Sequence, residues 1–352
     1  AIMSSQYLIE IARLFCRNSE ITGLKQLTSG NINRTFLVEL DPLAVNSSFI
    51  LQNINSSVFK DPESVIVNMH SVTKHIEDKR ENYQDLLVHR RWETPLIIPI
   101  VETSKLWFKD HDKYWRAITY IDQSSNFEFI SCSKQANQIG KALGIFHSLT
   151  SDFPLQEIHR SIIRLHDTPS IIKNYDQAWS HHSYAKSFDT LIRNRLEILN
   201  ENINKYRDYV CKLAADMERE NVSAALIHGD PKISNFLFDS HSNKAIALID
   251  LDTINQDSIH YDLADCIRSV CNPYGEELLE PNKACFDLNL FEALIKGYFS
   301  VRGSHFQEHD YDYLPYFVRI LPFELGLRFL TDYLNGNIYF KVDHIHQNLN
   351  RA

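Results

Sequence analysis

The chain has 352 residues, of which 44% are hydrophobic and 23% are charged, the balance of an ordinary soluble globular protein. At this length two lobes are expected rather than one small module. The formal charge is −9 and no basic cluster stands out, so binding to nucleic-acid phosphates is not expected. The apolar runs are far shorter than the roughly 20 residues of a membrane span, and the first residues carry no secretory pattern.

The six cysteines are spread along the chain and form no C-x-x-C pair. This spacing fits neither a disulfide framework nor a zinc site. Free thiols are typical of a reducing compartment, so a cytoplasmic location is expected.

The first third of the chain alternates between strand and helix patterns. Strands are predicted at 35–38 and 48–52, each bounded by turn residues. The sequence Asp61-Pro62-Glu63 is typical of a helix start, and apolar residues follow it at helical spacing. Alternation over 98–121 predicts a hairpin that ends in an apolar strand at 116–121.

From about residue 133 the pattern is helical, and the longest apolar stripe runs over 186–219. It is interrupted by three predicted strands at 225–227, 236–238 and 245–251, the last two joined by a polar turn. Residues 258–352 are predicted to be mainly helical. We therefore predict an α+β fold of two lobes, a small β-rich lobe over 1–118 and a larger, mainly helical lobe over 119–352.

The segment most informative about function reads LIHGDPKISNFLFD at 226–239 and ALIDLD at 247–252. Asp230 follows a strand, Asn235 lies five residues later, and Asp250 is predicted to end the third strand. A loop between short antiparallel strands can turn these side chains into one crevice. The spacing is the H-x-D-x-x-x-x-N pattern of kinase catalytic loops, followed by a metal-binding aspartate.

Phosphoryl transfer from ATP needs a base, oxygen ligands for Mg²⁺ and fixed positive charge. We interpret Asp230 as the base for the acceptor hydroxyl, and Asn235 and Asp250 as the ligands of Mg²⁺. Lys232 lies where its ammonium can reach the γ-phosphate, and His228 is expected to fix the loop by hydrogen bonds. The alternative interpretation is a polar turn with solvated carboxylates.

With these residues the chain resembles the aminoglycoside phosphotransferase and choline kinase superfamily, and within it the N-acetylhexosamine 1-kinases. The similarity is carried by segments 49–76, 114–121, 226–239, 248–272 and 325–340, the last reading LGLRFLTDYLNGNIYF. The resemblance implies a two-lobed protein-kinase-like fold. It also implies that ATP phosphorylates the anomeric hydroxyl of N-acetylglucosamine or N-acetylgalactosamine, giving the sugar 1-phosphate.

The resemblance further implies that Arg328 and Tyr339, in the last segment, line the sugar-binding wall. The alternative for Arg328 is an ion pair with Glu324 or Asp332, one turn away on the same helix. For Tyr339 the alternative is a core aromatic residue with a solvated hydroxyl.

Asp252 lies two residues beyond Asp250, which on a continuing strand places it on the same face. It is therefore expected to accept hydrogen bonds from sugar hydroxyls. Asp265 and Arg268 lie one helical turn apart and are interpreted as a structural ion pair.

On the nucleotide side, Tyr120 and Ile121 are expected by analogy to form the hinge that meets adenine, and Ser29 and Asn31 to flank the glycine of a short phosphate loop. Protein kinases carry a lysine on the third strand for the α- and β-phosphates. Here that position is Gln52, which we interpret as a neutral phosphate contact that binds nucleotide less strongly.

Other functions stay open. A kinase for choline, an amino alcohol or an aminoglycoside would need carboxylates or an aromatic cage around its cation. Gly229 matches these kinases, whereas hexosamine kinases commonly carry Asn there. A catalytically silent binding module is also possible in principle; Gln52 favours it and the intact Asp230, Asn235 and Asp250 argue against it. Expected partners are a nucleotide and a small-molecule acceptor, with neither nucleic acid nor membrane.

Overall fold

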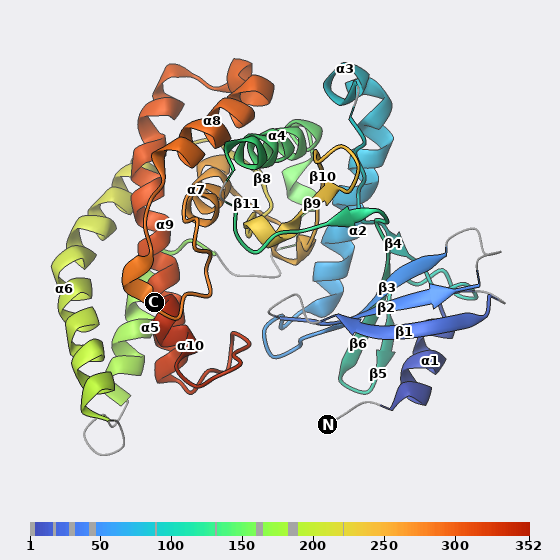
Figure 1. The fold of residues 1–352 in the computed structure, drawn as a ribbon, viewed down its shortest axis with the longest axis horizontal. Helices are drawn as coiled ribbons and strands as arrows, with labels where there is room; N and C mark the ends of the chain where they lie inside the picture. Colours follow the sequence, from blue (N-terminus) through green and yellow to red (C-terminus); the bar gives the residue numbers. More distant parts are fainter. Residues whose placement is uncertain are drawn as a thin grey trace.

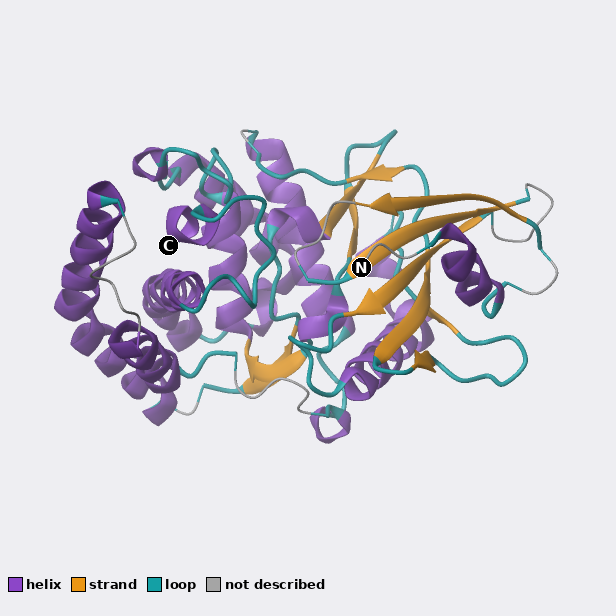
Figure 2. Ribbon diagram, turned by 90° about the horizontal axis from the view of Figure 1, so that it is seen from below, coloured by secondary structure: helices purple, strands orange, loops and turns teal. Residues whose placement is uncertain are grey.

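The computed structural model describes residues 4–16, 19–27, 32–41, 47–88, 90–130, 132–159, 165–181, 189–220 and 222–352. A β-sheet occupies one end of the molecule and helices gather at the other (Figures 1 and 2). The predicted α+β fold of two lobes is therefore confirmed. The boundary between residues 118 and 119 stays a prediction.

The N-terminal lobe is built on an antiparallel sheet in the order β1-β2-β3-β6-β4, with β5 pairing β6. Its strands are β1 (Ile21–Leu27), β2 (Arg34–Leu40), β3 (Ser48–Ile54), β4 (Ile97–Ile98), β5 (Phe108–Asp110) and β6 (Lys113–Thr119). Alternation buries Val38, Leu51 and Trp115 on one face, where α1 (Ser5–Arg13) packs against them. The predicted strands near 35, 48 and 116 are confirmed, whereas α1 and β1 were not predicted.

The remaining helices mostly form the C-terminal lobe. They are α2 (Pro62–Lys79), α3 (Gln84–Leu87), α4 (Ser133–Leu149), α5 (Thr168–His181), α6 (Thr190–Arg219), α7 (Ile259–Val270), α8 (Leu288–Arg302), α9 (Glu308–Leu334) and α10 (Gln347–Arg351). Helix α6 is the long amphipathic helix that the sequence predicts; the predicted residues 186–188 lie outside the described part. None of the described helices is long and apolar enough to cross a membrane. The cytoplasmic location stays a prediction.

Helix α2 joins the sheet to the helical lobe (Figure 1). The Asp61 carboxylate accepts the Ser64 N–H at 3.2 Å and caps the helix, as the sequence predicts. The apolar face of α2, which includes Val65, Met69 and Val72, packs into a hydrophobic core shared with α4 and α7. The two lobes are therefore held together by continuous apolar packing and not only by the chain between them.

Short strands carry the segment with the predicted catalytic residues. They are β7 (Ser124–Ser125), β8 (Ala224–Ile227), β9 (Phe236–Asp239), β10 (Ala245–Leu248) and β11 (Asn255–Ser258). The predicted hairpin is β9–β10, extended by β7, while β8 pairs with β11.

The strand predicted over 245–251 is too long. It ends at Leu248, and Asp250 adopts a left-handed conformation with φ 64° and ψ 58°. A 3-10 turn follows at Leu251–Thr253. Because a left-handed residue breaks the alternation of a strand, Asp252 does not share a strand face with Asp250, and that part of the prediction is wrong.

Helices α4 and α8 pack backbone against backbone. A Cβ atom on Gly140 would lie 2.1 Å from the carbonyl oxygen of Leu294, and one on Gly297 would lie 2.1 Å from that of Asn137. Because the atoms in the way belong to the backbone, no side-chain rotation can make room. The glycines set the distance between these two helices.

We expect Gly140→Ala to lower the free energy of unfolding by about 1–3 kcal/mol, because the added methyl group must push α8 away. Urea denaturation followed by circular dichroism measures the change. Gly303→Ala is the matched control, since its Cβ would lie 3.6 Å from the nearest atom and its φ of −57° suits alanine. That variant should be neutral or stabilised by up to about 1 kcal/mol. Equal destabilisation by both substitutions would argue against the close approach.

Candidate active site

A buried carboxylate on α7 anchors the catalytic loop. Asp262 accepts the backbone N–H of His228 at 2.6 Å and that of Gly229 at 2.8 Å, and His147 Nε2 lies 3.0 Å from the same carboxylate. Burial acts to raise the pKa of Asp262, but the hydrogen bond and charge of His147, the charge of His228 and the Gly229 N–H outweigh it and lower the pKa. Asp262 was not predicted as a functional residue; its only signal in the sequence is an acidic residue among apolar positions of a helix.

Gly229 is required by the backbone of this loop. Its φ is 86°, and a Cβ atom there would lie 2.4 Å from the carbonyl oxygen of Thr253. Asparagine tolerates a positive φ better than most residues, yet its Cβ would meet the same oxygen. Glycine at this position is therefore explained by the local packing of this chain.

His228 fixes the loop from within, as predicted. Its Nδ1 accepts the N–H of Asp230 at 3.2 Å, and its Nε2 donates to the carbonyl oxygen of Ile249 at 2.9 Å. This pattern needs a neutral ring with its proton on Nε2, and burial lowers the pKa of His228. The imidazole therefore links the start of the loop to the strand end that precedes Asp250.

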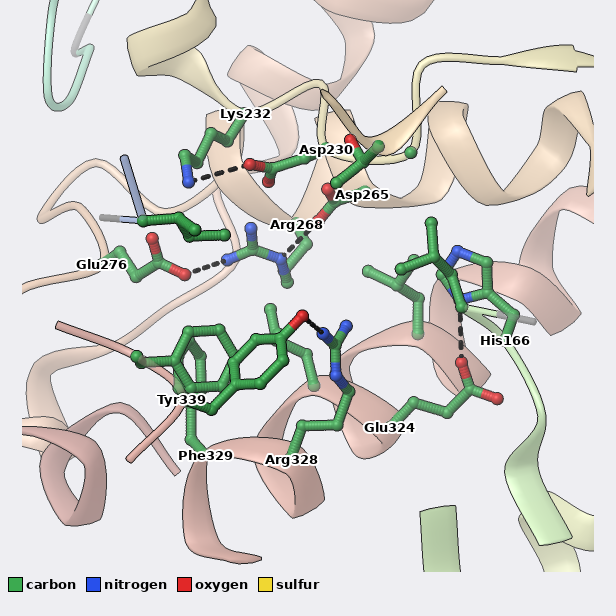
Figure 3. A pocket seen from close by; sticks show the side chains of 17 residues that line it. His166, Asp230, Lys232, Asp265, Arg268, Glu276, Glu324, Arg328, Phe329 and Tyr339 are labelled. Carbon is green, nitrogen blue, oxygen red and sulfur yellow. Dashed lines mark hydrogen bonds and ion pairs between the residues drawn. The ribbon is translucent and has the colours of Figure 1, made fainter. Parts of the chain in front are cut away.

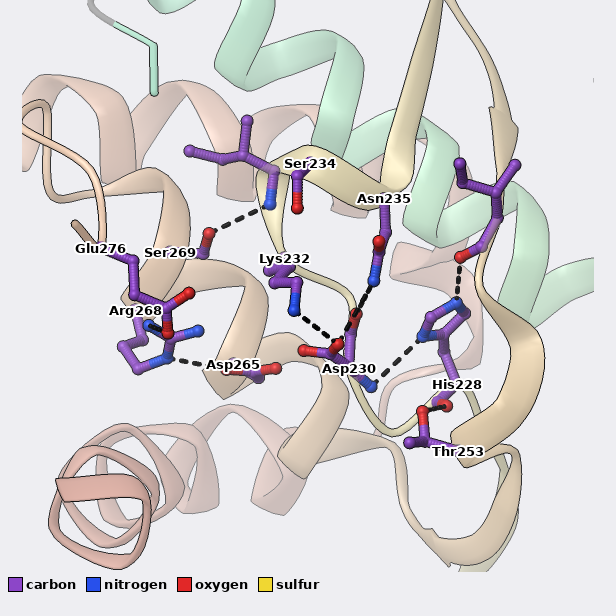
Figure 4. Close-up of polar contacts among 12 residues, drawn as sticks. His228, Asp230, Lys232, Ser234, Asn235, Thr253, Asp265, Arg268, Ser269 and Glu276 are labelled. Carbon is purple, nitrogen blue, oxygen red and sulfur yellow. Dashed lines mark hydrogen bonds and ion pairs between the residues drawn. The ribbon is translucent and has the colours of Figure 1, made fainter. Parts of the chain in front are cut away.

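The predicted base lies beside the predicted lysine and asparagine (Figure 4). Asp230 Oδ2 is 2.9 Å from Lys232 Nζ, and Asn235 Nδ2 donates to the Asp230 carbonyl oxygen at 2.7 Å. In the described part of the chain, Asp230 Oδ1 and the amide oxygen of Asn235 have no hydrogen-bond partner. The predicted roles of base and metal ligand require these two oxygens.

Asp250 follows β10 and completes the predicted group. Burial and the charges of Asp252 and Asp230 raise its pKa, while the charges of Lys232 and Arg116 act to lower it. Asp250 is therefore close enough to Asp230 and Lys232 for their charges to influence one another. The structure brings together the base, the lysine and both predicted metal ligands.

Among the described residues, two cavities meet at this loop. The larger, about 280 Å³, lies against the N-terminal sheet and is lined by the predicted nucleotide contacts Gln52, Tyr120 and Ile121, together with Asn235 and Asp250. Its size and its contact with the hinge are those expected of the nucleotide side. Ser29 and Asn31, the other predicted nucleotide contacts, lie outside the described residues.

The smaller cavity, about 80 Å³, lies against the helical lobe and is lined by Asp230, Arg328 and Tyr339. The predicted base and the two predicted wall residues therefore face one cavity (Figure 3). Because Lys232 lines both cavities, it lies where they join.

Most charged groups of the smaller cavity are paired. Arg268 Nε lies 2.8 Å from Asp265 Oδ1, which is the predicted ion pair, and Arg268 Nη1 lies 3.4 Å from Glu276 Oε1. Glu324 accepts a hydrogen bond from Thr168 at 2.5 Å, and His166 Nδ1 lies 3.0 Å from it. That this pair faces the cavity was not predicted, nor was its third member Glu276, which comes from a separate loop.

Arg328 is not bound to either acidic neighbour on its helix. Its guanidinium lies 5.7 Å from the ring centres of Tyr339 and Phe340, and Nη2 is 3.4 Å from the Tyr339 hydroxyl. The Glu324 carboxylate is hydrogen-bonded to His166 and Thr168 instead. The predicted alternative of an intrahelical pair is therefore wrong for Glu324.

Asp332 also has other partners. Its buried carboxylate accepts the backbone N–H groups of Ile338, Tyr339 and Phe340 at 2.7 to 2.9 Å, and the Asn348 side chain at 2.9 Å. It thereby folds the loop after α9 so that Tyr339 and Phe340 face Arg328. The intrahelical alternative is wrong for Asp332 too, and Tyr339 is not a core residue but part of the cavity wall.

Asp252 does not line either cavity within the described residues. Its Oδ1 lies 2.5 Å from Arg116 Nη2, and its Oδ2 accepts from Asn33 Nδ2 at 2.5 Å. The geometry behind its predicted sugar contact is therefore wrong: Asp252 connects the turn after Asp250 to the N-terminal sheet. The residue of this turn that lines the smaller cavity is Thr253.

Residues 23–287, more than half of the chain, match the APH family of phosphotransferase enzymes. The chain belongs to this family. It is thus a small-molecule phosphotransferase with an alcohol group as acceptor.

Solved structures agree on the fold. The phosphotransferase is similar to a spectinomycin phosphotransferase in complex with ADP and spectinomycin, with a TM-score of 0.64 and 15% identity, over 100% of this chain and 93% of that one. It is also similar to an ethanolamine kinase of Plasmodium vivax, with a TM-score of 0.58 and 14% identity, over 94% of this chain and 80% of that one. For a choline kinase of Cryptosporidium parvum Iowa II the TM-score is 0.56 and the identity 16%, over 99% of this chain and 95% of that one. At such identities the likeness establishes the protein-kinase-like fold.

We expect Asp262→Ala to lower the free energy of unfolding of this phosphotransferase by about 3–5 kcal/mol, because His147 and two buried N–H groups lose their partner. Urea denaturation measures the change. Asp176→Ala is the control, since the exposed Asp176 carboxylate lies 2.6 Å from Arg207 and such pairs contribute about 1 kcal/mol at most. A loss no larger than that of the control would show that Asp262 does not anchor the loop.

Proposed function

We propose that this phosphotransferase is an ATP- and Mg²⁺-dependent kinase that phosphorylates the anomeric C1 hydroxyl of N-acetylhexosamines to give the sugar 1-phosphate. The observation that carries the kinase reaction is the meeting of the two cavities at Lys232, with Asp230 on one side and Asn235 and Asp250 on the other. The choice of sugar rests on the sequence resemblance and on the charge balance of the smaller cavity.

Asn235 and Asp250 would hold Mg²⁺ beside the nucleotide phosphates. An amide oxygen and a carboxylate are the hard oxygen ligands that this ion prefers. Burial and the charges of Asp252 and Asp230 raise the pKa of Asp250 although Lys232 and Arg116 act against them, and a divalent cation would favour its charged form. No group of three or more His, Cys, Asp or Glu side chains suited to a metal occurs among the described residues. Asn235 and Asp250 would therefore be the ligands that the protein supplies, and the ion would neutralise charge on the phosphates.

Asp230 is positioned to accept the proton of the sugar hydroxyl through Oδ1. The hydroxyl oxygen then attacks the γ-phosphorus, the bond from the γ-phosphorus to the bridging oxygen of ADP breaks, and the proton ends on Asp230. Lys232 gives fixed positive charge to the group in transfer. Burial acts to lower the pKa of Lys232, but the charges of Asp230, Glu276 and Asp250 outweigh burial and raise the pKa, so the ammonium stays protonated.

The charges of the smaller cavity favour a neutral polar acceptor. Among the described lining residues, the carboxylates already have partners: Asp230 has Lys232, Asp265 and Glu276 share Arg268, and Glu324 has His166. A cationic acceptor needs carboxylates that are free to pair with it. Here the group without a carboxylate partner in the described chain is a cation, Arg328, which suits hydroxyl and carbonyl oxygens of a sugar.

Arg328 and Tyr339 together form the wall that would hold the sugar. The guanidinium carries several N–H donors in a fixed plane, and the tyrosine adds a hydroxyl and an aromatic face. Because the loop with Tyr339 is fastened by Asp332, the two side chains are held before any acceptor arrives.

A second candidate is a kinase for an amino alcohol or an aminoglycoside. It is favoured by the acceptors named for similar structures, which are spectinomycin, ethanolamine and choline. The paired carboxylates of the smaller cavity argue against it. A catalytically silent binding module is the remaining alternative.

An assay that couples ADP release to a colour change separates these candidates. The panel contains N-acetylglucosamine, N-acetylgalactosamine, the methyl glycoside of N-acetylglucosamine, choline, ethanolamine, spectinomycin and kanamycin. We expect turnover with one or both free N-acetylhexosamines and none with the methyl glycoside, because its anomeric oxygen carries no proton and is blocked. Turnover with the amines alone would contradict the proposal, and ATP binding without any turnover would favour the silent module.

Asp230→Asn serves as the control that the turnover belongs to this site. It should lower turnover by about 10² to 10⁴ because the base is lost, while ATP binding measured by calorimetry stays nearly unchanged. Asp312→Asn, at an exposed position on α9, should leave turnover unaltered. A loss of tenfold or less for Asp230→Asn would remove this residue from the role of base.

We expect Arg328→Ala to raise the KM for the acceptor by about tenfold or more, the usual effect of losing a hydrogen bond to a charged group, and to spare the KM for ATP. Steady-state kinetics with each substrate varied in turn measures both. Arg319→Ala removes an exposed arginine from the same helix and should change neither constant. Equal effects of Arg328→Ala on both constants would exclude a specific contact with the acceptor.

A further inference from the structure

The nucleotide cavity lacks the usual phosphate-binding pair at its usual positions. Protein kinases bind the α- and β-phosphates with a lysine on the third strand, held by a glutamate on the following helix. Here β3 presents Gln52 to the cavity and α2 presents Met69. Neither side chain carries a charge, although the phosphates of a nucleotide are strongly anionic.

A buried arginine lies on the neighbouring strand at the same level. Arg116 on β6 is the antiparallel partner of Gln52 on β3, and it lines the same cavity. Its Nε and Nη2 donate to Gln52 Oε1 at 3.0 and 2.7 Å, and Gln52 Nε2 donates in turn to Thr35 Oγ1 at 3.2 Å. Both ends of the Gln52 amide are therefore engaged, and its role is to hold the guanidinium rather than to contact phosphate itself.

The counterion of Arg116 comes from the metal-binding turn. Asp252 Oδ1 lies 2.5 Å from Arg116 Nη2, and the two side chains are only 2% and 1% exposed. Asp250 lies two residues before Asp252, and the charge of Arg116 acts on it. The cation is thus fixed next to the residue that would hold Mg²⁺.

One nitrogen of this guanidinium is unused. Arg116 Nη1 is buried and has no hydrogen-bond partner among the described residues. A buried N–H group without a partner is costly and is rarely left so. Arg116 lines the adjoining cavity, so a phosphate oxygen there would be an acceptor for Nη1, and guanidinium groups bind phosphate with strong, charge-assisted hydrogen bonds.

We propose that Arg116 is the cation that binds the nucleotide phosphates, in place of the third-strand lysine, with Asp252 as its counterion in place of the helix glutamate. The inference rests on the proposed function in one respect, that the larger cavity binds a nucleotide. It explains how a neutral residue, Gln52, can stand at the usual position of the lysine, since Arg116 on the adjacent strand supplies the positive charge.

Calorimetry with ADP and with adenosine, in the presence of Mg²⁺, tests the assignment. The two ligands differ only in the diphosphate, so a phosphate-binding residue affects ADP alone. We expect Arg116→Gln to weaken ADP binding by about 10- to 100-fold, the range for a hydrogen bond to a charged group. Adenosine binding should change by less than twofold, and Arg116→Lys should retain part of the affinity for ADP.

Two further variants keep the test decisive. Arg116→Gln combined with Asp252→Asn removes both charges, so it leaves no unpaired buried carboxylate and serves if the single variant fails to fold. Arg90→Gln is the control for losing a partly buried arginine elsewhere, since Arg90 donates to the Ala245 carbonyl oxygen at 2.6 Å and to Gln138 Oε1 at 2.9 Å. It should leave binding of both ligands unchanged.

The outcomes also separate this inference from the function on which it rests. If the wild-type protein binds ADP more tightly than adenosine and the Arg116 variants keep that preference in full, Arg116 is not the phosphate ligand, while the kinase assignment stands. If the wild-type protein binds neither ligand, the larger cavity is not a nucleotide site, and both are overturned. Equal losses for ADP and adenosine would mean that Arg116 only supports the fold of the cavity.

Discussion

The Asp262 carboxylate is buried in the helical lobe, and it can stay charged there only because donors surround it. Two of these donors are consecutive backbone N–H groups of the catalytic loop, from His228 and Gly229, and a third is His147. A loop that moved away would leave the carboxylate without them, which is costly at such burial. The direction in which Asp230 leaves the loop therefore depends on a carboxylate that is itself buried, with only 1% of Asp262 exposed.

The contact between the two lobes has an apolar part and a polar part. Apolar packing of α2 against the helical lobe brings the sheet close, and the Asp252 carboxylate adds a polar connection to Arg116 and Asn33. Since Asp252 belongs to the turn that begins at Asp250, the contact between lobes and the proposed metal ligand share one short segment. A shift of one lobe against the other would therefore move the proposed metal ligand Asp250.

Much of this arrangement could be read from the sequence because its signals are local. Strand alternation, the cap at Asp61 and the spacing of Asp230, Asn235 and Asp250 depend on neighbours along the chain. The errors have an equally physical cause. The sequence around 245–252 is apolar and strand-like, but the left-handed Asp250 ends the alternation and turns Asp252 toward the other lobe.

What could not be predicted depends on partners that only the folded chain brings together. The role of Arg116 depends on the strand register that places it opposite Gln52. The role of Asp262 depends on the packing of the loop against its helix. Neither can be deduced from the neighbouring residues along the chain. Loops add a second difficulty. Asp332 accepts backbone N–H groups, and because nearly every residue type carries such a group, the sequence does not indicate which residues will donate.

The acceptor cavity illustrates why composition alone misleads about substrates. Counted from the lining residues, its carboxylates look like a site for an amine. Their geometry argues against it, because Arg268 lies between Asp265 and Glu276 and the His166 ring lies beside Glu324. Once such pairs form, neither member attracts an ion as strongly as it would alone. Under the proposed function, acceptor choice would depend on the remaining groups, which are the Arg328 guanidinium beside two aromatic rings and one oxygen of Asp230. Such groups suit hydroxyl and carbonyl groups rather than a positive charge.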